Sequence, residues 1–396
     1  MKNNYKIAVI AACPFPYPRG TPIRILRMAE GLAARGHEVH VITYHLGQHI
    51  ADLPFQIHRI PNVPTYHKVT PGPTYQKIAI LDSLLSAKIF RVVQNGQFDI
   101  IHAHHFEGLL ASLPPARLLK IPLVFDVHTL LSTELQSYAM GIPVNMLERI
   151  GDFIDHWLPT HADHIVAVTN SIRKRLINEI NISPHKVTTV YGGVESDHFN
   201  SDVVSESILQ KKTVSISKTL IYTGNLASYQ GIDLMLHAFR KVLNHRPDTL
   251  LKIVTGFSIQ PYADLISRLG IQKNLIIENS DYFQLPRQLH SACIALNPRI
   301  ECDGLPLKLL NYMATGRAIV SFEGSAEVLE NEVTGLIVPN HNIDSFALAI
   351  LRFLEDPQLA EKLGQNAQSH VQEFFVWKTA IKSLELIYNQ LLETRL

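Results

Sequence analysis

A proline-rich loop near the start of the chain, CPFPYPRGTPIR over residues 13–24, holds residues able to bind an anion. Gly20 would let a ligand approach the backbone, and Arg19 and Arg24 could donate charge-assisted hydrogen bonds to a phosphate. The loop follows an apolar run and opens a helical pattern, so the first N–H groups of the helix would favour an anion there. An ordinary connecting turn explains the same residues equally well.

A second loop of this kind, YTGNLASYQG over residues 222–231, lies in the second half of the chain. Gly224 permits close backbone approach, and Gly231 stands where a helical pattern begins and free N–H donors are expected. Asn225 and Gln230 can donate hydrogen bonds, but neither carries a charge. A phosphate-binding loop and a plain turn both fit.

The stretch NPRIECDGLPLKLLNYMATG, residues 297–316, is the most informative about chemistry. Asp303 stands just before an expected helix N-terminus, which stabilises a carboxylate that could orient the hydroxyls of a sugar. Arg299 and Lys308 could neutralise a leaving diphosphate, and Asn311 lies one turn beyond Lys308. The alternative is that Asp303 caps the helix and Lys308 is a solvated surface residue. Further along, FEGSAEV is expected to open another helix with Glu327 near the same sheet edge, where a capping carboxylate is again the alternative.

Histidines cluster in FDIIHAHHFEG, residues 98–108. On a strand His102 and His104 would project to one face and His105 to the other, so a single metal site would need a bend and a further ligand. The sequence also has no Asp-x-Asp pair to hold a metal against a nucleotide diphosphate, so we expect no metal. We expect His102 to be structural, and His104, His105 and Glu107 to form a polar wall on the acceptor side of a cleft.

The run FDVHT, residues 125–129, ends another expected strand. Asp126 or His128 there would point into the same cleft. An imidazole at such a place can hydrogen-bond sugar hydroxyls or assist proton transfer, although a purely structural histidine is the alternative.

These loops are separated by the alternation expected of a parallel sheet covered by helices on both faces. β-Branched runs predict strands, and apolar residues at helical spacing predict helices. In the first half the pattern predicts strands at Lys6–Ala11, Val39–Thr43, Ile100–Ala103, Leu123–Val127, Ile165–Val168 and Val187–Val190 and a helix at Thr21–Arg35. In the second half it predicts strands at Leu220–Thr223, Leu250–Thr255, Leu275–Glu278, Cys293–Leu296 and Ala318–Phe322, with helices at Ile232–Leu243, Tyr262–Leu269, Leu307–Ala314 and Val376–Leu392 and two more after Asp344. The expected fold is therefore two doubly wound α/β domains with the functional site in the cleft between them.

Length and composition agree with two globular domains. The chain has 396 residues, against a typical domain of ~100–200 residues, and it is 46% hydrophobic and 18% charged, which excludes a disordered chain. Its net charge of +1 disfavours nucleic acid as a partner. Three scattered cysteines make neither a disulfide framework nor a zinc cluster. We see no secretory signal and no apolar stretch approaching ~20 residues, so we expect a cytoplasmic protein.

In motif order the sequence resembles the GT-B glycosyltransferases of family four, the group 1 class of retaining sugar transferases. The resemblance covers nearly the whole chain. Its matching stretches are Gly20 with GHEV (36–39), FDIIH (98–102), ADHIVAV (162–168), VYGGVE (190–195), Gly224 to Gly231, GLP (304–306), YMATG (312–316) and Glu327 followed by GLIVP (335–339).

The resemblance implies an acceptor-binding, Rossmann-like domain over 1–198 and a nucleotide-sugar donor-binding domain over 219–372. Residues 199–218, which are polar and without a sustained pattern, would form a linker or variable edge, and 373–396 a helix packing back on the first domain. Members transfer a sugar from a nucleotide diphosphate, keep the anomeric configuration and need no metal or other cofactor.

By the same resemblance Gly20 lies at the diphosphate or acceptor edge and His128 beside the transferred sugar. Two Glu residues that members carry eight positions apart fall on Asp303 and Asn311, and a basic pair that grips the diphosphate falls on Asn225 and Gln230. The expected catalytic residues are His128, Asp303 and Lys308. The expected donor-binding residues are Gly20, Gly224, Asn225, Gln230, Arg299, Gly304, Leu305, Asn311 and Glu327, and those of the acceptor side are Arg19, His104, His105 and Glu107.

The expected function is therefore a metal-independent, hexosyltransferase-type enzyme with a nucleotide-sugar donor and a glycan or lipid-linked acceptor, as in surface polysaccharide or glycolipid synthesis. A non-catalytic sugar-nucleotide-binding protein and, less favoured, a sugar-nucleotide epimerase are the alternatives. Residues 75–90 and 114–121 mix apolar with basic side chains, which suits either peripheral contact with the inner face of a membrane or ordinary core helices.

Overall fold

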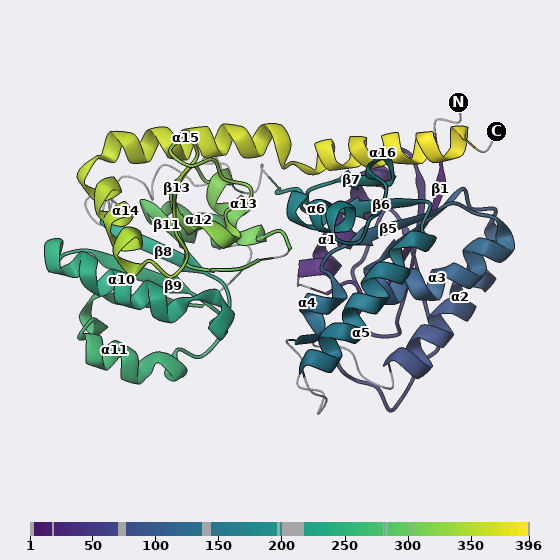
Figure 1. Ribbon diagram of the computed structural model, residues 1–396, viewed down its shortest axis with the longest axis horizontal. Helices are drawn as coiled ribbons and strands as arrows, with labels where there is room; N and C mark the ends of the chain where they lie inside the picture. Colours follow the sequence, from purple (N-terminus) through teal and green to yellow (C-terminus); the bar gives the residue numbers. More distant parts are fainter. Residues whose placement is uncertain are drawn as a thin grey trace. The chain divides into compact units, whose positions relative to one another are not determined.

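The computed structural model describes residues 4–17, 20–69, 77–136, 144–195, 199, 218–279, 281, 284–302 and 304–394 (Figure 1). The chain divides into two compact units. Unit 1 is Met1–Gly192 with Trp377–Leu396, and unit 2 is Gly193–Val376. Sequence analysis set the first boundary at residue 198, and of the expected linker 199–218 only Phe199 and Lys218 lie among the described residues.

Unit 1 is built on a seven-stranded sheet in the order β3-β2-β1-β4-β5-β6-β7, and every pair of neighbouring strands in it is parallel. Its elements are β1 (Lys6–Ala11), α1 (Gly20–Ala34), β2 (Glu38–Thr43), β3 (Gln56–Arg59), the π-helical η1 (Lys77–Leu81), α2 (Asp82–Gly96), β4 (Ile100–His104), α3 (His105–Leu119), β5 (Leu123–Val127), α4 (Leu131–Gln136), α5 (Val144–Trp157), η2 (Pro159–His161), β6 (His164–Ala167), α6 (Asn170–Asn178), η3 (Pro184–Lys186), β7 (Val187–Thr189) and α16 (Trp377–Glu393).

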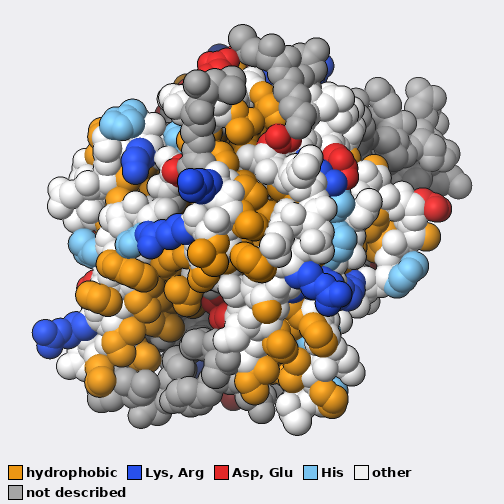
Figure 2. Space-filling view, turned by 90° about the vertical axis from the view of Figure 1, so that its right-hand side faces the viewer, with side chains coloured by type: hydrophobic (Ala, Val, Ile, Leu, Met, Phe, Trp, Pro, Cys, Tyr) orange, Lys and Arg blue, Asp and Glu red, His pale blue; other side chains and the backbone are white. Residues whose placement is uncertain are grey.

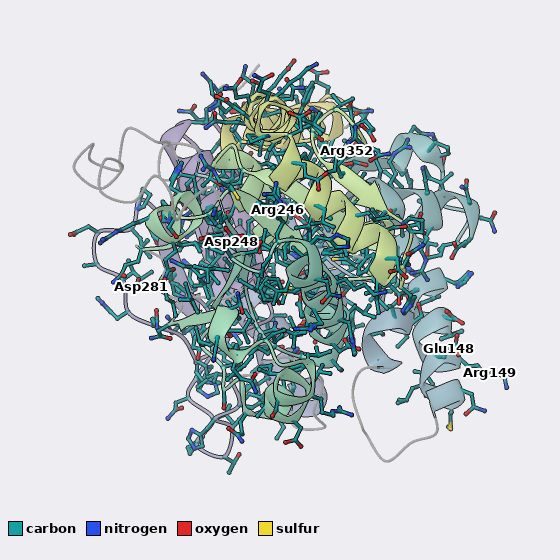
Figure 3. All side chains as sticks on the ribbon, turned by 90° about the vertical axis from the view of Figure 1, so that its left-hand side faces the viewer. Glu148, Arg149, Arg246, Asp248, Asp281 and Arg352 are labelled. Carbon is teal, nitrogen blue, oxygen red and sulfur yellow. The ribbon has the colours of Figure 1, made fainter. Side chains whose placement is uncertain are left out.

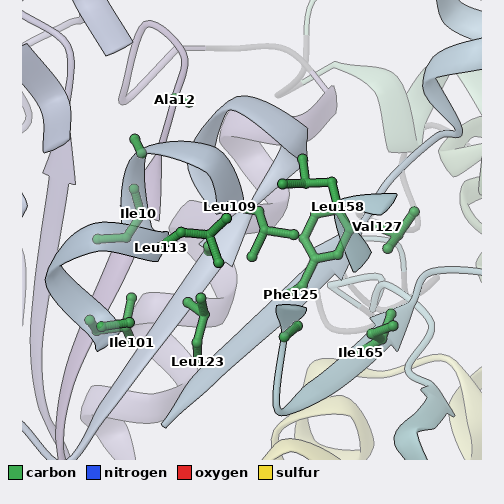
Figure 4. Close-up of a cluster of buried hydrophobic side chains, with 14 of the residues drawn as sticks. Ile10, Ala12, Ile101, Leu109, Leu113, Leu123, Phe125, Val127, Leu158 and Ile165 are labelled. Carbon is green, nitrogen blue, oxygen red and sulfur yellow. The ribbon is translucent and has the colours of Figure 1, made fainter. Parts of the chain in front are cut away.

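The central strands of unit 1 form because β-branched and aliphatic residues fill both of their faces. All five positions of β4 and of β5 are buried, as a parallel sheet covered by helices on both sides requires. On one face Leu109 and Leu113 of α3 pack on Ile101, Leu123 and other strand residues (Figure 4). The other face is covered by a second apolar cluster that α1 and α16 share with the strands.

The C-terminal helix α16 belongs to unit 1 although it follows α15 of unit 2 in the chain. It packs against α1, where a Cβ at Gly31 would lie 2.7 Å from Ile381 Cγ1, so the glycine makes room for the isoleucine. Glu385 accepts two hydrogen bonds from Arg35, at 3.0 and 2.9 Å. The helix begins at Trp377, so residues 373 and 374, which sequence analysis had placed with it, end α15 instead.

Unit 2 is built on a six-stranded sheet in the order β10-β9-β8-β11-β12-β13, again with parallel neighbours. Its elements are β8 (Thr219–Thr223), η5 (Ser228–Gln230), α10 (Ile232–His245), β9 (Leu250–Val254), η6 (Gln260–Tyr262), α11 (Ala263–Leu269), η7 (Gln272–Asn274), β10 (Leu275–Glu278), α12 (Leu285–His290), β11 (Ile294–Asn297), α13 (Leu307–Ala314), β12 (Ala318–Phe322), η8 (Glu323–Ser325), β13 (Leu336–Val338), α14 (Ile343–Glu355) and α15 (Pro357–Phe374).

The predicted parallel α/β sheets are confirmed, and the differences lie at the sheet edges. Strands β3 and β13 were not predicted, because β13 has only three residues and β3 (QIHR) has no fully buried position to give an apolar run. The helix expected to open near Glu327 is wrong. There the chain makes the short 3-10 helix η8 and a turn, and then enters β13.

Candidate active site

Within unit 2 the fold brings the loop after β8 against the loop after β11. Gly231 has a φ of 68°, and a Cβ there would lie 2.1 Å from the Pro298 carbonyl oxygen, so only glycine allows this contact. Tyr312 of α13 fixes the same junction, because its hydroxyl accepts a hydrogen bond of 2.8 Å from the Thr223 backbone N–H. The loop over residues 222–231, one of those expected to bind an anion, therefore lies against the segment that carries Arg299 and leads to Lys308.

Lys308 in the first turn of α13 lies at this junction. Its ammonium donates a hydrogen bond of 2.5 Å to Gln230 Oε1 and lies 3.4 Å from the Tyr222 hydroxyl and 4.5 Å from the centre of that ring. Burial and the nearby charge of Arg299 lower the pKa of Lys308 to about 7. Among the described residues no carboxylate forms an ion pair with it. An incoming anion would therefore stabilise the charged form of this amine.

Arg299 lies in the loop after β11, where its guanidinium stacks 5.0 Å from the centre of the Tyr229 ring. Asn225 donates a hydrogen bond of 3.0 Å to the Tyr229 hydroxyl within the loop after β8, and the stacking of Arg299 on Tyr229 joins the two loops a second time. The Arg299 carbonyl accepts from the Ser325 hydroxyl, and buried Asn297 donates to that same hydroxyl at 2.8 Å. Hydrogen bonds of the Ser325 and Asn297 side chains thus fix the loop that carries Arg299.

Within unit 1 the carboxyl ends of β4 and β5 carry a buried histidine cluster around Asp126. The Asp126 carboxylate lies 3.5 Å from His102 Nε2, 3.6 Å from His104 Nδ1 and 3.6 Å from His128 Nε2. Arg24 of α1 donates a hydrogen bond of 3.2 Å to the same carboxylate and another of 2.9 Å to the Val190 carbonyl. Asp126 is the common partner that holds these side chains together.

Hydrogen bonds and stacking fix the imidazoles. His104 Nδ1 and His128 Nε2 are 3.0 Å apart, and His128 Nδ1 lies 3.5 Å from the Thr21 hydroxyl. His105 has a φ of 62° and begins α3, so the chain turns there and its ring stacks on His128 at 4.5 Å. Sequence analysis had placed His105 on the opposite face because it applied the alternation of a strand through residue 105, whereas β4 ends at His104.

The charges around Asp126 lower its pKa, whereas the charge of Asp126 raises the pKa of His104 and of His128. Burial alone would raise the pKa of Asp126, but Arg24 and the imidazoles hold that pKa well below its usual range. Burial lowers the pKa of both His104 and His128 well below the usual value, and Asp126 offsets this only in part. Asp126 is therefore ionised and the two imidazoles are neutral near pH 7.

His102, His104 and Asp126 form a group that could hold a metal ion, since their ligand atoms lie within 4.8 Å of one another. The donor set suits zinc or a similar ion. However, Arg24 already neutralises the single carboxylate, and a divalent cation would add uncompensated charge to a buried site. The residues present therefore fit a metal poorly, and we derive no metal chemistry from them.

Two residues of the expected polar wall on the acceptor side are buried in the structure. His104 is fully buried, and Glu107 is buried in an ion pair with Lys77 of η1. His105 is half-buried beside His128. Arg24, expected at a phosphate, instead pairs with Asp126 in the interior.

The other predicted residues are placed as follows. Gly20 is exposed at the start of α1, with nothing within 4 Å of where its Cβ would lie. Gly224, Asn225, Gln230 and Arg299 lie with Lys308 at the junction of the two loops, and Gly304, Leu305 and Asn311 lie in the segment and helix that carry Lys308. Glu327 is exposed in the turn after η8. Arg19 and Asp303 lie outside the described residues.

Sequence reasoning missed Tyr222 and Tyr388. Tyr222 lies on β8, and its ring lies under the Lys308 ammonium. Tyr388 of α16 hydrogen-bonds His102 Nδ1 at 2.6 Å. Tyr222 could have been found as the strand residue preceding the glycine loop. No local signal marks Tyr388, because its partner is 286 residues away in the chain.

Comparison with known proteins decides the family. Residues 18–198 match the family described as Glycosyltransferase Family 4, and residues 205–370 match Glycosyl transferases group 1, so the two matches together take in most of the chain. The chain belongs to the family-4, group 1 glycosyltransferases. It is a glycosyltransferase enzyme, which removes the non-catalytic alternative.

Two similar proteins illustrate the range of this family. This glycosyltransferase is 24% identical to the D-inositol 3-phosphate glycosyltransferase of Thermobifida fusca, over 94% of this chain and 89% of that protein. It is 26% identical to the N-acetyl-alpha-D-glucosaminyl L-malate synthase of Bacillus anthracis, over 98% of each.

Solved structures confirm the fold class. The sucrose-phosphate synthase of Thermosynechococcus elongatus superposes with a TM-score of 0.82 at 17% identity, covering 98% of this chain and all of that one. HepE of Anabaena, solved in complex with UDP, gives 0.75 at 17% identity and covers 97% and 100%. The glycosyltransferase thus has the predicted GT-B fold of two Rossmann-like parallel-sheet units. Among the described residues, no helix combines the length and apolar character needed to cross a membrane.

Proposed function

We propose that this glycosyltransferase transfers the sugar of a nucleotide-diphosphate donor, with retention of the anomeric configuration and without a bound metal, to a glycan or lipid-linked acceptor. The observation that carries the donor class is Lys308. Its amine is partly buried without a carboxylate partner among the described residues, beside a glycine loop and a helix N-terminus. A diphosphate supplies the charge that this arrangement lacks.

The comparisons support the same donor class. HepE of Anabaena is described in complex with UDP and with UDP-glucose, and the glycosyltransferase shares the fold of that protein. The sequence resemblance to metal-independent, retaining enzymes supports the absence of a metal and the stereochemistry. We propose uridine diphosphate sugars as the first donors to test.

In the proposed reaction the bond between the anomeric carbon and the phosphate oxygen breaks, and negative charge grows on the departing diphosphate. Lys308 and Arg299 would meet that charge, and they accelerate the reaction only insofar as their interactions strengthen as it develops. The acceptor hydroxyl forms its bond to the anomeric carbon on the face the diphosphate leaves, and its proton passes to the departing phosphate oxygen. No carboxylate is assigned as a covalent nucleophile.

In unit 1 we propose that His128 contacts the transferred sugar. Its imidazole is neutral and is held by Asp126, His104 and Thr21. A neutral imidazole can donate or accept a hydrogen bond from a sugar hydroxyl without repelling an oxocarbenium-like centre. Asp303 is kept from the sequence as the residue that orients the sugar from the donor side.

The donor is tested by calorimetric binding of UDP, GDP and ADP and of the matching nucleosides. We expect one diphosphate to bind much more tightly than its nucleoside, and Lys308→Met to remove most of that difference, roughly ten- to a hundredfold. Lys273→Met, an exposed lysine of unit 2, is the control and should change neither affinity. A Lys308→Met protein that still prefers the diphosphate by the same factor would refute the assignment.

Stereochemistry and acceptor class are tested by turnover. The preferred nucleotide-sugar is incubated with candidate glycan and lipid-linked acceptors, and the anomeric proton coupling of the product is measured by NMR. Retention is expected. An inverted product would contradict the proposed reaction without touching the donor assignment.

A further inference from the structure

The outer surface of α2 and α3 combines cations with exposed apolar side chains. The two helices pack against each other on one face of the sheet of unit 1 (Figure 1). We call this surface the α2–α3 face, and it comprises Lys88, Arg91, Leu110, Arg117, Leu118 and Lys120. Beyond their first turns neither helix contains Asp or Glu, although the whole chain has 36 basic and 35 acidic residues. The face is therefore locally positive on a nearly neutral protein.

Three of the four cations of this face form no ion pair among the described residues. Among the described residues, no carboxylate pairs with Lys88, Arg91 or Arg117. Elsewhere exposed cations do find partners: Arg352 forms two hydrogen bonds to Glu332, and Lys218 pairs with Asp248, where Arg352 and Asp248 are labelled in Figure 3. The positive charge of these three side chains is thus left for something outside the chain.

Apolar side chains on the same face are exposed at helical spacing. Leu110 and Leu118 of α3 are 41% and 71% exposed, two turns apart on one side of the helix. Figure 2 views the side on which Figure 1 labels α2 and α3, and it shows hydrophobic and basic side chains intermingled there. Isolated exposed leucines are common, but a group of them among cations is a feature of membrane-binding surfaces.

The neighbouring helix α5 extends the apolar surface. It lies beside α3, since Ile154 of α5 and Phe106 of α3 pack on the same core cluster. Its solvent side exposes Met146, Ile150, Phe153 and Trp157, a stripe at spacings of four, three and four residues. Polar residues flank this stripe, with Glu148, Arg149 and Asp152 exposed; Figure 3 shows Glu148 and Arg149 projecting from the helix.

We propose that the α2–α3 face and the α5 stripe bind the surface of an anionic phospholipid bilayer. The cations are attracted to the lipid headgroups, and the leucines and the aromatic residues of α5 enter the interface between headgroups and acyl chains. A second copy of the chain is a poorer occupant, because its α2–α3 face would bring the same cations against these. Nucleic acid would leave the apolar stripe without a partner. The inference goes beyond the reaction, since membrane binding needs neither donor nor acceptor.

The test is co-sedimentation of the full chain with vesicles of phosphatidylcholine alone and of phosphatidylcholine with phosphatidylglycerol. We expect binding to the anionic vesicles, weakened by added salt because screening shortens the reach of the cations. Removing one cation should weaken binding about fivefold at low salt, so the triple variant Arg91→Gln, Arg117→Gln, Lys120→Gln should lose roughly a hundredfold. Phe153→Ser with Trp157→Ser should lose a comparable amount that does not depend on salt.

The control is a triple variant of exposed cations in unit 2, Arg240→Gln, Arg268→Gln, Lys273→Gln, which removes the same charge. It should bind vesicles like the parent protein. All of these positions are exposed, so circular dichroism and the melting temperature should be unchanged. The proposal is overturned if the parent protein binds no anionic vesicles, if it binds neutral vesicles equally well, or if the two triple variants lose the same affinity.

Discussion

The affinity of the glycosyltransferase for a nucleoside diphosphate should fall as pH rises above about 7, because Lys308 must be protonated to meet the phosphates. Its pKa is lowered to about 7 by burial and by Arg299, and the hydroxyl of Tyr222 beside it stays protonated, since burial raises its pKa far above neutrality. Near neutral pH the unliganded protein therefore holds a mixture of amine and ammonium.

Binding of a diphosphate favours the ammonium and raises the pKa of Lys308 in the complex. Between the two pKa values binding takes up one proton, so the association constant falls about tenfold per pH unit, or 1.36 kcal/mol. From about pH 7 to about pH 9 the loss is roughly a hundredfold if the pKa in the complex lies above that range. A terminal phosphate titrates near pH 6 and is fully ionised throughout, so its own titration contributes little.

Titration calorimetry at about pH 8 in two buffers of different ionisation enthalpy measures this proton directly. We expect roughly one proton taken up per diphosphate bound by the parent protein. Lys308→Arg keeps the charge at every accessible pH and should show no uptake and a flat affinity. A parent protein that binds the diphosphate with constant affinity and no proton uptake over this range would refute the reasoning.

Other predictions follow from the described contacts. Arg24→Met should lower the free energy of unfolding by about 3–5 kcal/mol, because Asp126 is left buried and unpaired; chemical denaturation measures it, and a loss below about 1 kcal/mol would contradict the role of the pair. Gly231→Ala should cost more stability and more diphosphate affinity than Gly270→Ala, because both glycines have φ near 65° but only Gly231 would place a Cβ against the Pro298 carbonyl. Treatment with a chelator should leave the transfer rate unchanged, and a loss that added metal restores would overturn metal independence.

Local sequence patterns were sufficient for many of the strands and helices. The bounds of β1, β5, β10, β12 and α13 were predicted to the residue, because each is a short apolar run between turn-forming residues or, for α13, a helical pattern after proline. The edge strands β3 and β13 were missed, although the edge strands β7 and β10 were predicted, because β3 has no fully buried position and β13 has only three residues. The loop with Gly224 and Gln230 and the segment that leads to Lys308 were also predicted to lie at one edge of the sheet. Parallel strands direct the loops that follow them to the same edge.

Pairings between distant residues could not be predicted. Arg24 and Asp126 are 102 residues apart, and nothing near either one indicates that the arginine turns inward to the carboxylate instead of outward to a phosphate. Glu107 was taken for a cleft residue for the same reason, because its partner Lys77 lies in another element. Sequence shows which polar groups are available, whereas tertiary packing decides which of them neutralise one another.

The position of Lys308 gives the strongest argument that the phosphate-binding charge has changed its place in the chain. In the family that the sequence resembles, a basic pair falls on positions 225 and 230, which here are Asn and Gln. The Lys308 ammonium lies 2.5 Å from Gln230 Oε1, at the far end of that side chain. A cation is therefore present near where a lysine at 230 would place its own, but it is supplied by α13.

A lysine at position 230 should therefore restore the diphosphate affinity that is lost when the charge of Lys308 is removed. Lys308→Met should weaken diphosphate binding roughly ten- to a hundredfold, and adding Gln230→Lys to it should recover most of that loss. Gln230→Lys alone should bind no more tightly than the parent protein, because two ammonium groups would then compete for one place. Gln272→Lys, on an exposed turn of unit 2, is the matched control in the Lys308→Met background and should recover nothing. If Gln230→Lys and Gln272→Lys both recovered the affinity, the net charge of unit 2 and not the position of the lysine would be what matters. Recovery by neither would mean that Lys308 acts through a geometry that position 230 cannot reproduce, and the exchange would be refuted.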